Sequence, residues 1–132
     1  MEFPIKIREA QQSDIDLICL IQESNSNFLE NMNREIIEER IRNHADTFLL
    51  ACLDDQVVAY ILGAEFANSS LSRWIKEMAN GETISGRIFV IDGLSVHPEY
   101  QGQGFGTLLL AALKQVALQQ NCPGIYLFCK DE

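Results

Sequence analysis

A short glycine-rich segment, Gln101–Gly106, is the part of the sequence whose residue types most directly suggest binding chemistry. It reads Gln-Gly-Gln-Gly-Phe-Gly and lies between the apolar runs Arg87–Val96 and Thr107–Leu113. Glycines let a backbone approach a bulky ligand and turn its N–H groups outward, and a helix that starts there adds positive partial charge. The segment therefore predicts a loop that binds phosphate without a basic side chain. A tight strand-to-helix turn that binds nothing is the alternative.

Two common nucleotide-binding motifs do not describe this loop. The Rossmann fingerprint needs a further glycine or alanine where the chain has Thr107, and an acidic residue about 20 positions on, where it has Tyr126 and its neighbours. A P-loop needs Gly-Lys-Ser or Gly-Lys-Thr, which the sequence lacks.

Asp92 is the only acidic residue in the apolar run Arg87–Val96. An unpaired carboxylate is costly to desolvate, so Asp92 needs a partner or a function. Strand alternation predicts that its side chain shares a face with those of Val90, Leu94 and Val96. Two interpretations stay open: a salt-bridged or water-facing carboxylate, or a group that deprotonates or anchors an amine.

The elements that must position these residues follow from periodicity, caps and turn residues. In chain order we expect a strand at Ile5–Arg8, a helix after Ser13, a helix after Asn33, strands at Thr47–Leu53 and Gln56–Phe66, a short helix at Leu71–Met78, a strand at Arg87–Val96, a helix from Gly104 to about Gln120, and a strand at Ile125–Cys129. This order predicts an α/β fold with one mixed sheet flanked by helices, ending in a right-handed parallel crossover.

Particular residues mark the element ends. Ser13, with Asp16 three positions on, predicts a capping box for the first helix, and Asn33 predicts the cap of the second. Asp54-Asp55 predicts a hairpin turn. The buried stripe of the second helix is expected to be Ile36, Ile37 and Ile41.

Composition excludes several classes of protein. A chain of 132 residues with 47% apolar and 22% charged residues fits one globular domain and no disordered or coiled-coil chain. Ten Lys and Arg against nineteen Asp and Glu give a net charge of −9, which would repel nucleic acid and weakly favour a cationic substrate.

Targeting and metal signals are also missing from the sequence. Met1–Ile21 does not resemble a secretory signal, and no apolar run approaches the ~20 residues of a membrane span. Cysteines at positions 19, 52, 122 and 129 show no CxxC spacing. We therefore expect reduced thiols, no bound metal and a cytoplasmic protein.

The segment Leu94–Leu109 resembles the acetyl-CoA-binding motif of the GNAT superfamily of N-acetyltransferases. That motif is an apolar strand, then (Gln/Arg)-x-x-Gly-x-(Gly/Ala), then a buried helix, and Gln101, Gly104 and Gly106 occupy its defining positions. The resemblance covers essentially the whole chain and is strongest over Ile88–Phe128. Looser features resemble the arylalkylamine (serotonin-type) enzymes: Leu-Ser-Val-His-Pro, the insertion Leu71–Met78 and the ending Leu-Phe-Cys.

The resemblance implies a GNAT-like acyl-CoA N-acyltransferase fold and transfer of acetyl from acetyl-CoA to the primary amine of a small molecule, by direct attack in a ternary complex. It implies no metal, and it assigns the pantetheine and the carbonyl to backbone groups of Leu94, Ser95 and Val96. Pyrophosphate binding falls to the amides of Gln101, Gly102, Gln103, Gly104, Phe105, Gly106 and Thr107.

The resemblance also suggests residues on the acceptor side. Asp92 stands where the arylalkylamine enzymes carry a histidine that works through water, whereas their other base position falls on Val90, which cannot titrate. The family often shapes its acceptor site between the first two helices, near Phe28. Glu65 is a second candidate for holding a cationic amine, with a solvated strand-end carboxylate as the alternative.

One departure from the family concerns the end of the sequence. Members usually continue with a helix and a strand pair that supply a tyrosine general acid, whereas this chain stops at Glu132 and Tyr126 does not match that position. We therefore expect a single GNAT domain over residues 1–132, and three interpretations stay open. The domain is C-terminally incomplete, a partner completes the sheet, as in a homodimer joined through the edge at Ile125–Cys129, or acid catalysis is absent or supplied in another way. A protein N-terminal or lysine acetyltransferase and a degenerate acyl-CoA-binding module without turnover are the alternative functions.

Overall fold

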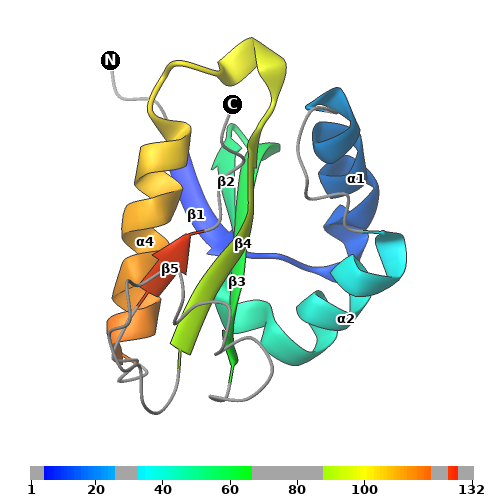
Figure 1. Ribbon diagram of the computed structural model, residues 1–132. Coiled ribbons are helices and arrows are strands. Elements are labelled where there is room, and N and C mark those ends of the chain that lie inside the picture. Colours follow the sequence, from blue (N-terminus) through cyan, green and yellow to red (C-terminus); the bar gives the residue numbers. More distant parts are fainter. Residues whose placement is uncertain (1–4, 26–32, 67–87, 120–124, 128–132) are drawn as a thin grey trace.

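A five-stranded sheet runs through the centre of the computed structural model, which describes residues 5–25, 33–66, 88–119 and 125–127. The strands lie in the order β1-β2-β3-β4-β5 (Figure 1). The elements are β1 Ile5–Glu9, α1 Ile15–Ser24, α2 Arg34–His44, β2 Phe48–Leu53, β3 Gln56–Phe66, β4 Ile88–Val96, α4 Phe105–Gln119 and β5 Ile125–Leu127, with 3-10 turns at Gln12–Asp14, Ala45–Thr47 and Pro98–Tyr100. The predicted α/β class with a mixed sheet is confirmed.

The first four strands pair antiparallel and β5 pairs parallel to β4, as the predicted crossover requires. The hairpin between β2 and β3 turns at Asp54 and Asp55, whose φ values are 49° and 65°. Positive φ at both central residues is the requirement of a type I′ turn, and aspartate tolerates that conformation. The predicted hairpin is therefore confirmed. The predicted helix at Leu71–Met78 lies outside the described residues.

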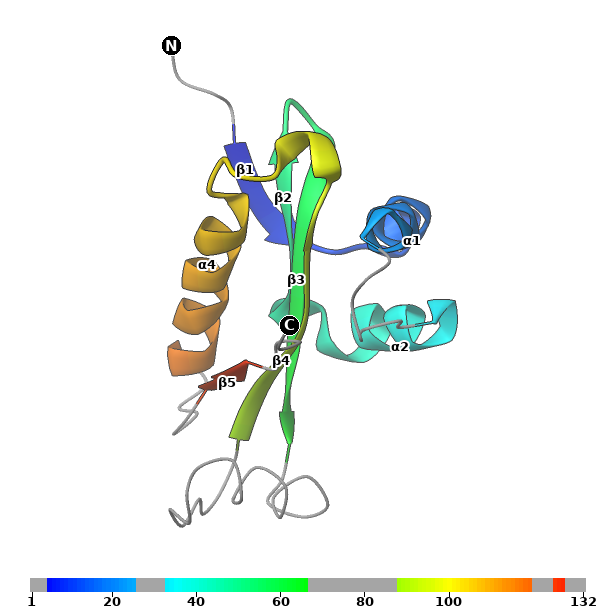
Figure 2. The same ribbon diagram turned by 45° about the horizontal axis from the view of Figure 1, so that its top comes forward.

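Helices cover both faces of the sheet, with α4 on one side and α1 and α2 on the other (Figure 2). Buried residues of the α1 and α2 layer include Ile18, Ile21, Ile37 and Ile41, which pack on Phe48, Leu50, Tyr60 and Leu62. The α4 layer includes Phe105, Leu109, Leu113 and Ala117, which pack on Ala59, Ile61, Phe89 and Ile91. Strands β2 and β3 are therefore apolar on both faces.

Strand β4 contains one residue more than its partner β3 requires. Leu62 pairs with Gly93 and Gly63 pairs with Ile91, so Asp92 is the additional residue. Because a bulge shifts the alternation of side chains by one position, Leu94 and Val96 join the α4 layer together with Phe89 and Ile91. The predicted strict alternation along β4 is therefore wrong, because Ile91 and Leu94, three positions apart, pack in the same layer.

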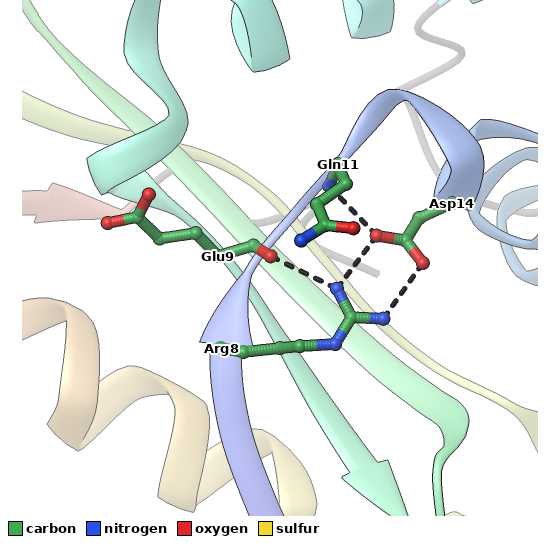
Figure 3. A network of polar contacts seen from close by, with 4 residues as sticks. All are labelled: Arg8, Glu9, Gln11 and Asp14. Carbon is green, nitrogen blue, oxygen red and sulfur yellow. Dashed lines mark hydrogen bonds and ion pairs between the residues drawn. The ribbon is translucent and has the colours of Figure 1, made fainter.

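The start of α1 also differs from the prediction, because Asp14 and not Ser13 organises it. The Asp14 carboxylate accepts the backbone N–H of Gln11 at 2.8 Å and pairs with both terminal nitrogens of Arg8, at 2.8 and 2.9 Å (Figure 3). Asp14 is 6% exposed, whereas Ser13 is exposed to solvent. The chain leaving β1 is thereby fixed to the first turn of the helix layer.

The predicted cap of α2 is confirmed, since Asn33 Oδ1 accepts the Ile36 N–H at 2.9 Å. The predicted stripe is right at Ile37 and Ile41, which are buried, and wrong at Ile36, which is 41% exposed. Among the described residues, no helix is both long and apolar enough to cross a membrane.

Candidate functional site

The glycine loop begins where β4 ends. After Val96, His97 Nδ1 accepts the N–H of Glu99 at 3.1 Å, and the His97 carbonyl accepts the N–H of Tyr100 at 2.8 Å. These two bonds turn the chain away from the sheet.

Two glycines of the loop have backbone conformations that favour glycine. Gly102 and Gly104 have φ values of 80° and 90°, and a Cβ built on either would meet no atom within 4 Å. The backbone at these two residues therefore faces open space, as a loop that admits a bulky ligand requires.

The same loop leads directly into α4. The Leu108 N–H donates to the Gly104 carbonyl at 3.0 Å, so the N–H groups of Phe105, Gly106 and Thr107 precede the first intrahelical bond. Phe105 is buried, and its ring packs nearly perpendicular to that of Tyr100, with the centroids 6.2 Å apart. A rigid helix start thus presents free N–H groups beside the open glycines, and this arrangement fits a pyrophosphate.

The end of β4 offers backbone groups on the side away from β3. His97 N donates to Val58 O at 2.8 Å, and along an antiparallel ladder the hydrogen-bonded positions alternate. Ser95 is therefore a hydrogen-bonded position toward β3, whereas the N–H and C=O groups of Leu94 and Val96 point to the other side. In the described residues β5 pairs with β4 only at Phe89–Ile91, so it does not reach these groups.

A cavity of about 330 Å³ lies between this end of β4 and the loop. It is lined by Asn25, Leu94, Ser95, Val96, Gln101 and Gly106. The structure thus brings together five of the residues that the sequence had predicted at one site: Leu94, Ser95 and Val96 of β4, Gln101 of the loop and Gly106 at the start of α4. Gln103 and Thr107 are exposed beside them.

Asn25 is the lining residue that sequence reasoning missed. Its Nδ2 donates to Ser95 Oγ at 2.6 Å and to the Val96 carbonyl at 3.0 Å, and its Oδ1 accepts from Gln101 Nε2 at 2.8 Å. An asparagine at a helix end signals a C-cap. Nothing in the sequence links it to residues 70 or more positions later.

The other predicted residues lie in different places. Asp92 is the bulge residue of β4, next to Ile91, where the described pairing with β5 ends. Glu65 pairs with Phe89, at the end of β4 opposite to the loop, so the backbone does not bring Glu65 to the glycines. Phe28 lies outside the described residues.

Neither cysteine in the described residues resembles a nucleophile. Cys52 is buried in β2 and Cys19 half-buried in α1. Burial raises the pKa of both thiols, so they stay protonated at neutral pH. Cys122 and Cys129 lie outside the described residues. Within that same part of the chain, no three or more His, Cys, Asp or Glu residues gather as a metal site would need.

The decisive comparison is with protein families. The model of the acetyltransferase (GNAT) family matches residues 15–132. The chain belongs to this family. A GNAT protein is an acetyl-transfer enzyme, and the matched range includes β4, the glycine loop and α4.

Curated relatives are distant but similar over most of their length. An acetyltransferase of Photorhabdus laumondii is 23% identical over 129 residues, which cover 97% of this GNAT chain and 77% of that protein.

Solved structures share the fold at low sequence identity. An aminoglycoside N-acetyltransferase in complex with CoA has a TM-score of 0.68 at 13% identity, covering 98% of this chain and 80% of that one. A ribosomal-protein-alanine N-acetyltransferase from Brucella melitensis has a TM-score of 0.65 at 16% identity, covering 96% and 80%. These two GNAT neighbours act on very different acceptors, so the fold leaves the acceptor open.

Proposed function

We propose that this GNAT enzyme transfers the acetyl group of acetyl-CoA to the primary amine of a small molecule, by direct attack in a ternary complex. The observation that carries the proposal is the open backbone at Gly102 and Gly104, directly before the free N–H groups of α4. An anionic cosubstrate fits this loop even though the chain carries a net charge of −9.

In this proposal the backbone of the chain binds two parts of acetyl-CoA, the pyrophosphate and the pantetheine arm. The loop amides from Gln101 to Thr107 hold the pyrophosphate. The outward N–H and C=O groups of Leu94 and the outward N–H of Val96 receive the pantetheine arm as an added strand, while the Val96 carbonyl accepts from Asn25 and Gln101. The cosubstrate supplies an acetyl thioester. The amine nitrogen bonds to its carbonyl carbon, the carbon–sulfur bond breaks, the amine loses a proton and the thiolate takes one up.

Asp92 is proposed to take the amine proton through water or to anchor the cationic amine. Its support is its position, since it is the bulge residue two before Leu94, whose backbone groups are proposed to hold the thioester. Two further acceptor-side residues are proposed: Phe28 on the family resemblance, and Glu65 as a strand-end carboxylate that can hold a cationic amine. The general acid for the thiolate is not assigned to any described residue.

A panel of acceptors tests the function directly. Acetyl transfer from acetyl-CoA is measured with aromatic amines, polyamines, aminoglycosides, and peptides with free N-termini or lysines. Turnover with free amines but not peptides supports the proposal, and a preference for aromatic amines supports the arylalkylamine resemblance. Turnover with peptides alone favours the protein acetyltransferase. CoA binding without turnover on any amine favours the degenerate module.

Gly104→Glu is expected to abolish CoA binding. The variant places a side chain and a negative charge in the open space before α4, and its φ of 90° strains any residue other than glycine. Calorimetry with CoA measures the effect. Gln115→Glu, on the exposed side of α4, adds the same charge away from the loop and is expected to bind CoA like the wild type. Unchanged affinity in Gly104→Glu would contradict the loop as the binding site.

The edge of the described sheet suggests an assembly. Strand β5 is last in the strand order, and its sequence is apolar. An edge of this kind can pair with another chain, so a homodimer through β5 is proposed as part of the function.

A further inference from the structure

Asn25 joins the end of α1 to two parts of the site, the end of β4 and the start of the glycine loop. It directly follows α1, which ends at Ser24, and it is half-buried. Its amide contacts Ser95 and Val96 at the end of β4 and Gln101 at the start of the glycine loop. A single side chain therefore connects the layer of α1 to the loop on which the proposed function depends.

The Val96 carbonyl closes these contacts into a ring. It accepts from Asn25 Nδ2 at 3.0 Å and from Gln101 Nε2 at 3.1 Å, while Gln101 Nε2 also donates to Asn25 Oδ1 at 2.8 Å. Gln101 is otherwise an exposed residue, and an exposed glutamine samples many rotamers. The ring keeps it in one of them.

We propose that Asn25 is a positioning residue for acetyl-CoA: by holding Gln101 against the Val96 carbonyl, it fixes the direction of the loop amides before the cosubstrate binds. The inference rests on the proposed binding of acetyl-CoA at this loop. Gly102 and Gly104 give the loop wide conformational freedom, and ordering it costs free energy at the moment of binding. A loop that is already ordered at its first residue binds more tightly.

A purely structural role for Asn25 would be capping of α1. Its Nδ2 lies 3.2 Å from the Ile21 carbonyl, and the neighbouring Ser24 Oγ donates to the Leu20 carbonyl at 2.8 Å. Ser24→Ala therefore removes a hydrogen bond at the same helix end, and this bond of Ser24 lies within α1. Ser24→Ala is therefore the matched control, because it weakens the end of α1 without removing a contact to Gln101.

The test is a double-mutant cycle on CoA affinity, measured by calorimetry with the full chain. Asn25→Ala and Gln101→Ala are each expected to weaken CoA binding by about 3- to 10-fold, the range of one hydrogen bond. Because both variants break the same ring, the double variant should bind no more weakly than the weaker single variant. Ser24→Ala should bind like the wild type. In kinetics, Asn25→Ala should raise KM for acetyl-CoA by the same factor and leave kcat unchanged.

A second readout needs no cosubstrate. The backbone NMR order parameters of Gly102, Gly104 and Gly106 in the free protein should be lower in Asn25→Ala than in the wild type, and unchanged in Ser24→Ala. If Asn25→Ala does not fold, Asn25→Leu takes its place, because its side chain is similar in size and can neither donate to the Val96 carbonyl nor accept from Gln101. The same losses are then expected.

The outcomes separate the positioning role from the proposed function. If the wild type binds CoA and Asn25→Ala binds it equally well, or if the losses in the double variant add, the positioning role is wrong. If the wild type itself does not bind CoA, the proposed function is wrong and the inference fails with it.

Discussion

At the scale of single residues, Asp92 gives the sharpest prediction. Asp92→Asn should lower kcat/KM by about 10²- to 10⁴-fold at neutral pH, the usual contribution of a general base. CoA affinity should stay the same, because the loop is untouched. The acidic limb of the pH–rate profile should also move when an acceptor is used whose own ionisation lies outside the measured range.

Asp54→Asn is the control for Asp92→Asn. Asp54 is an exposed hairpin residue with a φ of 49°, a conformation that asparagine also tolerates. It should leave turnover unchanged. If Asp92→Asn keeps turnover within about twofold and lowers the melting temperature, Asp92 is structural and not a base.

The contacts of Asn25 show why part of the site could not be predicted from single residues. The glycine loop was predictable, because its residues are consecutive and their conformations follow from glycine itself. The contacts of Asn25 with Ser95 and Gln101 join residues 70 and 76 positions apart. Such contacts follow from the packing of α1 on the sheet, which periodicity does not specify.

At the scale of elements, the Arg8–Asp14 pair determines how the chain passes from β1 into α1. The Arg8 guanidinium and the Gln11 N–H hold the pKa of Asp14 below its usual value. The ionised carboxylate therefore stabilises the folded state above about pH 4, the ordinary range of aspartate, and this contribution is lost as pH falls through the folded pKa.

Asp14→Asn should lower the free energy of unfolding by about 1–3 kcal/mol at pH 7, since it removes a charge-assisted pair at a buried position. Between pH 5 and pH 2 the variant should lose less stability than the wild type. Urea unfolding at several pH values measures both effects.

Asp16→Asn is the matched control for Asp14→Asn. Asp16 also lies 2.8 Å from an arginine nitrogen, that of Arg34, but its side chain is 84% exposed compared with 9% for Asp14. Exposed pairs contribute little, so its unfolding curve should match that of the wild type. Equal losses in the two variants would contradict the importance of burial at Asp14.

The elements themselves were predictable where the signal is local. The strands, the Asp54-Asp55 hairpin and the Asn33 cap follow from neighbouring residues and agree with the structure. The prediction failed at Ser13 and at the alternation of β4. In both cases a residue's environment depends on a partner elsewhere in the chain: Arg8 for the start of α1 and strand β3 for the bulge.

At the scale of the whole molecule, the proposed homodimer through β5 predicts concentration-dependent assembly. Sedimentation across the micromolar range should show a dimer whose fraction rises with protein concentration. A lysine on an edge strand opposes pairing with a second chain and keeps the backbone bonds to β4, so Tyr126→Lys should weaken the dimer. Leu118→Ser, on the exposed side of α4, is the control and should leave assembly unchanged. A monomer at every concentration would contradict the dimer.

The additional residue in β4 limits how this protein can evolve. Phe89 and Ile91 precede it and Leu94 and Val96 follow it, yet all four side chains pack in the α4 layer. Deleting one position there would either turn Phe89 and Ile91 toward the opposite layer or slide that half of the strand against β3. Related proteins with a different chemistry can carry another residue type at position 92. The number of residues between Ile91 and Leu94, in contrast, should be the same in all of them.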